Sequence, residues 1–373
     1  MRILIFSCLY PPQVSGYSAE LRAFAASLVS RGHSVKVVTC NTNKVASAEN
    51  MDGVDVVRLP CWNMLGGLFP VPKPSRALWL LRNERPDVVS VQTRFFATTL
   101  MGTVLAREKR VRLVLTERGS THSMSGNVVV DTLCKLYDHT VSSWIARSCD
   151  YCVGISDESC RFLAHLGGRH VTKVPLGVRE PYISTGRRCD VQCNTVIFVG
   201  RLTRSKRVHD LLEVFRTIRK RVPGVKLMLV GDGDCREELE MSSGDDVLFL
   251  GMRRPDEVAH LLSVSSVFVS ASCTEGMSLS VAEAATIGLP VVAYVAGGMR
   301  ELIEDGVTGY LVEQGDIEGM ASRVTGLLLD KEQAERMGKA GQEKMNREYG
   351  WDNVVDSYLS LFCGTQSGID KHQ

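Results

Sequence analysis

The sequence lacks any apolar run approaching the ~18–20 residues of a membrane-spanning helix, so we expect no bilayer span. The stretch from Met1 to Cys8 is too short for a signal-peptide apolar region and predicts a first strand instead. No G-x-G-x-x-G follows that strand, which argues against a nicotinamide dehydrogenase. No basic run is interleaved with aromatic residues, so nucleic acid is not an expected partner.

Metal and disulfide signals are also weak. The twelve cysteines are scattered, and Cys149-x-x-Cys152 has no second pair at zinc spacing. A chain of 373 residues that is 44% hydrophobic needs no disulfides, so we expect reduced thiols and a cytoplasmic protein, free or at the membrane face. Asp232-Gly-Asp234 has the D-x-D form of a metal pair, but two acids in a glycine turn are commonplace. We therefore predict no metal site and no required cofactor.

The net charge is only +2, but it is unevenly distributed. Residues 1–180 hold 22 basic and 14 acidic residues, whereas the remainder holds 22 and 28. The basic half suits an anionic partner such as a phosphate, an acidic glycan or a membrane surface, with Arg76, Arg82 and Arg107 as candidate contacts. The alternative is ordinary surface charge. Segment 76–82, with Trp79, could lie on a membrane, but a buried helix face is favoured.

Short β-branched runs alternate with longer amphipathic segments, which is typical of parallel sheets covered by helices. The predicted strands are 2–7, 34–39, 54–58, 87–91, 112–116, 150–155, 171–174, 195–199, 225–230, 247–250, 267–269 and 290–293, and the clearest helices are 18–31, 206–221 and 278–287. Pro, Gly and polar residues interrupt the pattern at 179–194, which predicts a linker. We expect Rossmann-like domains at 1–178 and 195–350, facing one cleft, and a C-terminal helix over 351–373 that returns to the first domain.

The most specific chemical signal lies in 270–301, where a strand, a glycine-containing turn and a helix start follow one another. Free backbone N–H groups at such a helix start form an anion site. Glu275 lies in the turn and Glu283 within the helix, so the two carboxylates are spaced to hold different parts of one elongated ligand. The alternative is a helix with two solvated carboxylates.

A second signal follows the first strand of the second domain, in Gly200-Arg201-x4-Lys206. Arg201 and Lys206 can together neutralise a pyrophosphate, Arg as a fork and Lys as a point charge. Taken alone, two solvated cations are the simpler interpretation.

In combination, these motifs resemble the retaining glycosyltransferase family 4, which has the GT-B fold. The E-x7-E pair and Gly288-Leu-Pro290 belong to the resemblance. So do Leu9-Tyr10-Pro11-Pro12 with Gly16 and Glu20, Arg31-Gly32-His33, Pro175-Leu176-Gly177-Val178 and Trp351 to Tyr358. The likeness extends over nearly the whole chain and is specific for the family, but not for the substrate.

The resemblance implies a role for each matching position. Arg201 and Lys206 would bind the donor diphosphate and stabilise the leaving nucleoside diphosphate. Glu275 would contact the donor sugar, the backbone of Gly276, Met277, Ser278 and Leu279 would meet sugar and phosphate, and Glu283 would bind the ribose. Gly231 and Arg253 would border the nucleoside, and Gly16 would allow close approach of the donor. The resemblance also implies that no metal is needed.

The sequence departs from the family pattern in three places. Ser15-Gly16 replaces two adjacent glycines, and Leu176 replaces an asparagine. A histidine is usual soon after the strand at 112–116, but Arg118 stands there and His122 follows four residues later. Either Arg118 or His122 would then take that place, and we count His122 among the candidate catalytic residues.

The resulting prediction is a retaining hexosyltransferase that uses a UDP- or GDP-sugar. Its acceptor would be a carbohydrate or a lipid-linked molecule, with negative charge favoured, in the synthesis of cell-surface polysaccharide, glycolipid or glycoprotein glycan. Peripheral contact with a membrane is part of this prediction. The alternatives are a nucleotide-sugar epimerase of the same fold and a non-catalytic subunit that binds nucleotide sugars.

Overall fold

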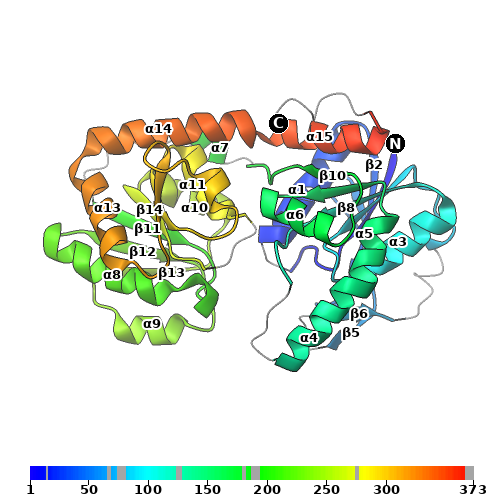
Figure 1. Ribbon diagram of the computed structural model, residues 1–373, viewed down its shortest axis with the longest axis horizontal. Coiled ribbons are helices and arrows are strands. Elements are labelled where there is room, and N and C mark those ends of the chain that lie inside the picture. The colour runs from blue at the N-terminus through cyan, green and yellow to red at the C-terminus, as the bar shows by residue number, and fades with distance from the viewer. Residues whose placement is uncertain are drawn as a thin grey trace. The chain divides into compact units, whose positions relative to one another are not determined.

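The computed structural model describes residues 1–13, 16–64, 69–73, 81–122, 128–178, 182–185, 194–273 and 277–365 (Figure 1). The chain divides into two compact units. Unit 1 comprises Met1–Pro175 together with the chain from Val354 onward, and unit 2 comprises Leu176–Asn353. No described helix is long and apolar enough to cross a membrane.

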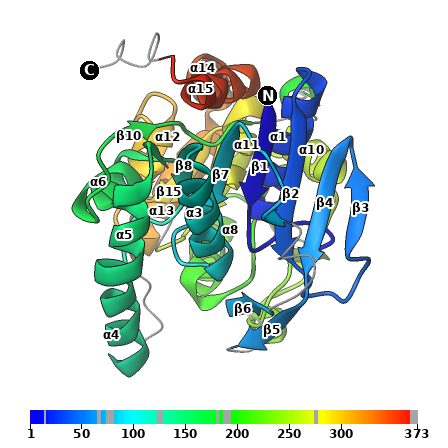
Figure 2. The ribbon, with the colours of Figure 1, turned by 90° about the vertical axis from the view of Figure 1, so that its right-hand side faces the viewer.

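Unit 1 is built on an eight-stranded sheet in the order β10-β9-β8-β7-β1-β2-β4-β3. All neighbouring strands are parallel except β3 and β4, and Figure 2 shows β3, β4 and β2 side by side at one edge. The strands are β1 (Arg2–Phe6), β2 (Ser34–Cys40), β3 (Ala48–Met51), β4 (Val54–Leu59), β7 (Val88–Gln92), β8 (Arg112–Glu117), β9 (Tyr151–Gly154) and β10 (Val171–Lys173), and a separate hairpin pairs β5 (Cys61–Met64) with β6 (Phe69–Pro72).

Helices cover this sheet, as the alternating pattern predicts, and its central strands are buried on both faces. The helical segments of unit 1 are α1 (Gly16–Ser30), α3 (Ala97–Lys109), α4 (Val128–Tyr137), the π-helix η2 (Asp138–Ser142), α5 (Ser143–Ser148) and α6 (Asp157–His165). Phe24 of α1 packs on Tyr358 of α15 (Trp351–Cys363), with ring centroids 4.7 Å apart. Helix α15 therefore contributes to the core of unit 1.

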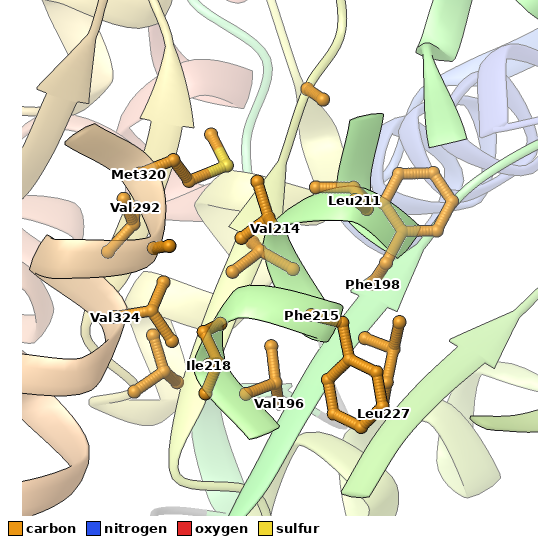
Figure 3. Packing of buried hydrophobic residues seen from close by; sticks show 14 of the residues in the cluster. Val196, Phe198, Leu211, Val214, Phe215, Ile218, Leu227, Val292, Met320 and Val324 are labelled. Atoms are coloured by element: carbon orange, nitrogen blue, oxygen red, sulfur yellow. The ribbon is translucent and has the colours of Figure 1, made fainter. Parts of the chain in front are cut away.

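Unit 2 contains a six-stranded parallel sheet in the order β13-β12-β11-β14-β15-β16. Its strands are β11 (Thr195–Val199), β12 (Lys226–Val230), β13 (Val247–Gly251), β14 (Val267–Ser270), β15 (Val291–Tyr294) and β16 (Gly309–Val312), and its helical segments are α7 (Tyr182–Thr185), η3 (Arg204–Lys206), α8 (Val208–Arg221), α9 (Arg236–Ser242), α10 (Pro255–Ser263), α11 (Leu279–Ile287), α12 (Met299–Leu302), α13 (Ile317–Leu329) and α14 (Lys331–Glu348). Figure 3 shows the apolar face of α8 packed between the sheet and α13, where Phe215, Ile218 and Val324 are fully or almost fully buried.

The chain order of both sheets reverses next to the first strand, which is the Rossmann-like arrangement that the sequence predicts. The structure adds elements that the pattern does not reveal: β3, the β5–β6 hairpin and the edge strand β16. Such strands are short or exposed, so they lack the apolar signature of a central strand. It also adds α7 within the predicted linker, where Tyr182 is buried and the helix contacts α10 and α11.

Cys8, Cys40, Cys149, Cys152 and Cys235 are buried and form no disulfide. Cys149 and Cys152 are buried, and their thiols donate to the carbonyls of Ile145 and Ala146 at 3.2 and 3.5 Å. These two residues belong to the core of unit 1.

Candidate functional site

The predicted donor-site residues of unit 2 that the structure describes lie at the carboxyl edge of its sheet. The central strand β11 lies between β12 and β14. The chain continues from β11 to β12 on one side and from β14 to β15 on the other, so the loops after β11 and β14 are neighbours that lead to opposite halves of the sheet. Ligands of open α/β sheets bind at such a switch point. The topology therefore places residues 200–206, 271–273 and 277–278 at the position where a nucleotide is expected.

Arg201 and Lys206 lie in the loop that follows β11. Arg201 is exposed, whereas its neighbour Leu202 is fully buried and anchors the loop. The backbone N–H and the thiol of Cys273 both donate to the carbonyl of Ser205, at 3.1 and 3.2 Å. Two hydrogen bonds thus join the loop after β11 to the loop after β14, and the segment with both cations lies against the approach to α11.

The start of α11 leaves backbone donors available. Ser278 is the N-cap residue and its side chain makes no capping hydrogen bond. Met277 is buried, and its sulfur accepts a hydrogen bond from the Leu176 N–H at 3.4 Å. Glu283 is half-buried on the second turn of the helix. Glu275 and Gly276 lie outside the described residues.

Gly231 and Arg253 belong to the same edge, after β12 and β13. A Cβ on Gly231 would lie 1.9 Å from the carbonyl oxygen of Gly200, and its φ is +132°, so this contact requires glycine. The Gly231 N–H donates to the carbonyl of Gly251 at 2.9 Å. Arg253 follows that carbonyl by two residues and pairs with Glu257 at 3.6 Å. Four consecutive strand ends therefore contribute to one surface.

Two supporting contacts were not predicted. The Gln314 side-chain amide donates to the carbonyls of Cys273 and Val295, at 3.1 and 2.8 Å, and so ties the loop after β16 to the loops after β14 and β15. Tyr294 donates to Asp210 at 3.1 Å, and burial together with the Asp210 charge raises the Tyr294 pKa. These residues are far apart in the sequence and form no motif, so only the fold reveals them.

In unit 1, Arg118 is held inward at the carboxyl edge. Its guanidinium pairs with Glu20 at 2.5 Å, donates to Gln92 at 2.8 Å and lies 4.5 Å from the centre of the Tyr17 ring. Burial alone would lower the Arg118 pKa, but the charge of Glu20 raises it above its ordinary value. Burial raises the pKa of Tyr17 to about 12. Arg118 therefore remains a cation and joins α1 to the strand ends.

His122 belongs to a different set of contacts. Its Nδ1 lies 2.8 Å from Asp138, which is fully buried. Asp138 also pairs with Arg94, which reaches Glu117 at 3.0 Å. Burial alone would raise the Asp138 pKa, but hydrogen bonds and charge from Arg94 hold it below its ordinary value of 3.8. Arg118 and His122 are thus positioned by separate acidic partners.

The remaining unit 1 candidates are divided between the two edges of the sheet. Gly16 is the first residue of α1, which follows the carboxyl end of β1. Arg107 lies in the last turn of α3, which ends just before β8 begins and is therefore at the opposite, amino-terminal edge of the sheet. Arg82 lies at the same edge, because its carbonyl accepts a hydrogen bond from Lys109 of that turn. Arg107 lines a pocket of about 480 Å³ there. Arg82 and Arg107 therefore do not lie at the carboxyl edge of the sheet.

Segment 76–82 falls mostly outside the described residues, and Arg76 and Trp79 are among those not described. Leu81, the first described residue after the gap, is 5% exposed and packs in the core of unit 1. This burial supports the interpretation of the end of the segment as a buried helix face.

The fold is shared with solved structures of known proteins. The Anabaena protein HepE, solved in complex with UDP-glucose, aligns with a TM-score of 0.75 over 98% of this chain and 100% of its own, at 19% identity. Sucrose-phosphate synthase from Thermosynechococcus elongatus aligns with the same TM-score, coverage and identity. The protein has the GT-B fold of glycosyltransferases, as predicted.

The sequence comparisons then give the family. Residues 15–177 match the glycosyl transferase 4-like domain, and residues 188–344 match the glycosyl transferases group 1. Glycogen synthase from Mycobacterium tuberculosis is 26% identical over 100% of this chain and 97% of its own length. The chain belongs to the group 1 glycosyltransferases of the family 4 type, and it is a glycosyltransferase enzyme.

Proposed function

We propose that this enzyme transfers a hexose from a UDP- or GDP-sugar to a carbohydrate or lipid-linked acceptor, with retention of configuration. The observation that carries the proposal is the pair of hydrogen bonds from Cys273 to Ser205, which join the loop holding Arg201 and Lys206 to the loop that precedes α11 at the switch point of unit 2. Two cations beside a helix start with open N–H groups suit a diphosphate. The complex of HepE with UDP-glucose supports this class of donor.

Each residue has a defined task in this mechanism. Arg201 and Lys206 stabilise the charge that develops on the departing nucleoside diphosphate. Glu275 orients the donor sugar and Glu283 the ribose, while Gly231 lets the chain pass close to the nucleoside and Arg253 borders the base. The leaving phosphate itself accepts the proton of the incoming hydroxyl as the acceptor attacks from the same face. The enzyme contributes orientation, charge stabilisation and exclusion of water.

No metal is part of the proposed transfer. The Asp232 carboxylate accepts from the Gly233 N–H at 2.8 Å and lies 3.5 Å from Arg236, as expected for an acid that stabilises a glycine turn. The diphosphate charge is instead met by Arg201, Lys206 and the start of α11.

The acceptor is proposed to be anionic and to lie at a membrane face in the cytoplasm. The helix α4 has no buried residue, and its Val128, Val129, Leu133 and Leu136 side chains are at least 60% exposed. Figure 2 shows α4 extending away from the sheet of unit 1. Such a surface suits the headgroup boundary of a bilayer. Alpha-monoglucosyldiacylglycerol synthase from Streptococcus pneumoniae, which is 25% identical over 83% of this chain and 75% of its own length, supports a lipid acceptor.

Substitution of the two cations tests this function. Arg201→Ala and Lys206→Ala should each lower turnover by roughly 10²–10³, the scale for loss of one positioned charge-stabilising donor. Arg204→Ala is the matched control, because Arg204 is an exposed arginine of the same loop and has no assigned role. All three variants should fold, as judged by circular dichroism. Wild-type turnover in both test variants would refute the assignment.

A further inference from the structure

Three histidines of unit 1 come together although no sequence motif links them. His122 lies in the loop after β8, His139 in η2 and His165 in the last turn of α6. His122 is half-buried, whereas His139 and His165 are exposed. Among the described residues, they are the only group of three or more His, Cys, Asp or Glu residues arranged to share one ion.

The spacing of the rings matches a common metal ligand set. One ring nitrogen from each histidine lies within 4.8 Å of the others. The ring centroids are 5.2 Å apart for His122 and His139, 5.4 Å for His139 and His165, and 6.1 Å for His122 and His165. Three imidazoles bound tetrahedrally at Zn–N distances of about 2.0–2.1 Å place their centroids roughly 5 Å apart. Small side-chain rotations would close the remaining difference.

A buried carboxylate orients one of these rings. Asp138 is held as an anion by two hydrogen bonds from Arg94, at 2.8 and 3.1 Å, and by Ser142 at 3.0 Å. It can therefore only accept from His122 Nδ1, at 2.8 Å. In neutral His122 this fixes the proton on Nδ1 and leaves the lone pair on Nε2. Carboxylate–histidine pairs of this kind orient the ligands of metal sites.

In η2 the carboxylate is buried and the second histidine is exposed. Asp138 points into unit 1 with no exposed surface, and the next residue, His139, is exposed. The segment Asp138–Ser142 is a π-helix between α4 and α5, and π-helical turns are frequent at functional sites. The π-helical turn thus supplies one proposed ligand, His139, and the carboxylate of Asp138 that orients another, His122.

We propose that His122, His139 and His165 bind a divalent transition-metal ion of the Zn²⁺ class, with water in the fourth position. Imidazole nitrogen suits Zn²⁺, Ni²⁺, Cu²⁺ and Co²⁺, and the three ligands leave one position open. The bound ion ties the loop after β8 to η2 and α6. Because Nδ1 is committed to Asp138 and Nε2 to the metal, His122 has no ring nitrogen left for the donor. The site goes beyond sugar transfer and does not depend on the proposed donor or acceptor.

Metal titration of the full chain, prepared without a histidine tag, tests this proposal. Wild-type protein should bind one Co²⁺ with the visible absorption of tetrahedral coordination by nitrogen and oxygen, and without near-ultraviolet bands from thiolate ligands. Zn²⁺ should displace the Co²⁺ and raise the melting temperature. His139→Ala and His165→Ala should each weaken binding by more than about tenfold, and the double variant should abolish it.

His170→Ala is the matched control, since His170 is an exposed histidine of the same unit outside the cluster. It should bind Co²⁺ as the wild type does. His139 and His165 are exposed, so their variants should retain the far-ultraviolet circular dichroism of the wild type. Wild-type Co²⁺ affinity in the double variant, or thiolate bands in the wild-type spectrum, would overturn the proposal.

Turnover separates this inference from the proposed function. The metal site predicts that His139→Ala and His165→Ala lose metal binding and retain transfer. Loss of turnover in His122→Ala alone, without metal binding in the wild type, would instead assign His122 to the donor. Failure of the Arg201 and Lys206 experiment would leave the metal titration unaffected.

Discussion

Replacement of Arg94 by methionine should be among the most destabilising single changes in unit 1. Its side chain is 5% exposed and bonds two carboxylates, Glu117 and Asp138, that have no exposed surface. It also donates to the Thr121 carbonyl at 3.0 Å and lies 4.4 Å from the centre of the Phe162 ring. Methionine preserves much of the volume but leaves both acids without their charged partner.

The expected loss in free energy of unfolding is about 3–5 kcal/mol, the range for breaking a buried ion pair on one side. This is a large fraction of the roughly 5–15 kcal/mol that stabilises a typical protein. Arg22→Met is the control, because Arg22 also forms a two-pronged pair, with Asp52 at 2.6 and 3.2 Å, but both side chains are more than 40% exposed. That change should cost less than about 1 kcal/mol.

The difference should depend on pH. In the wild type the pKa of Asp138 is lowered, so its ion pair stabilises the fold above the unfolded-state pKa and is lost as pH falls through the lower folded value. Arg94→Met removes that effect, so the two proteins should differ most near pH 7 and approach each other below about pH 4. Urea unfolding followed by circular dichroism, fitted with separate transitions for the two units, measures this. A cost for Arg94→Met no larger than that for Arg22→Met would refute the reasoning.

Three further changes have defined outcomes. Gly231→Ala should lower the free energy of unfolding, measured with urea, by about 2–5 kcal/mol, because the added Cβ would clash with the Gly200 carbonyl. The control Gly224→Ala, where φ is +77° but the surrounding space is open, should lower it by only about 1–2 kcal/mol. Equal losses in the two variants would contradict the clash at Gly231. Raising the salt concentration should raise the acceptor KM more than the donor KM. The double variant Lys44→Glu/Lys73→Glu, with changes after β2 and β6, should reduce this salt sensitivity, whereas the control Arg107→Glu should not. An acceptor KM that does not depend on salt would favour a neutral acceptor. Initial transfer rates should survive EDTA, and loss of activity rescued by Mn²⁺ or Mg²⁺ would show a metal-dependent reaction.

The sequence predicts the fold well where burial produces a pattern. Strands such as β1 and β11 are buried on both faces and read as continuous apolar runs, so their positions follow from the residues alone. Strands β3 and β16 are not predicted, because edge strands are partly exposed to solvent and so lack a continuous apolar run. The motifs around Arg201 and Ser278 also predict which loops carry the proposed site, because each loop directly follows a central strand.

Contacts between residues far apart in the sequence cannot be predicted in this way. Gln314 bonds to Cys273 across 41 residues, and no local pattern distinguishes it from another surface glutamine. Arg118 can be identified as a departure from the family motif, but its partner Glu20, 98 residues away, cannot. The cluster of His122, His139 and His165 likewise depends on the packing of a loop and two helices. Such sites require the folded chain.

The central claim is that this chain transfers a sugar, and product release tests it most directly. Purified protein incubated with UDP- and GDP-sugars should release nucleoside diphosphate in proportion to added acceptor, and the glycosylated product should retain the anomeric configuration of the donor. The Lys206→Ala variant should release roughly 10²–10³ less in the same time. Epimerised nucleotide sugar without acceptor would identify an epimerase, and donor binding without any acceptor-dependent release would identify a binding subunit; either result would contradict the account.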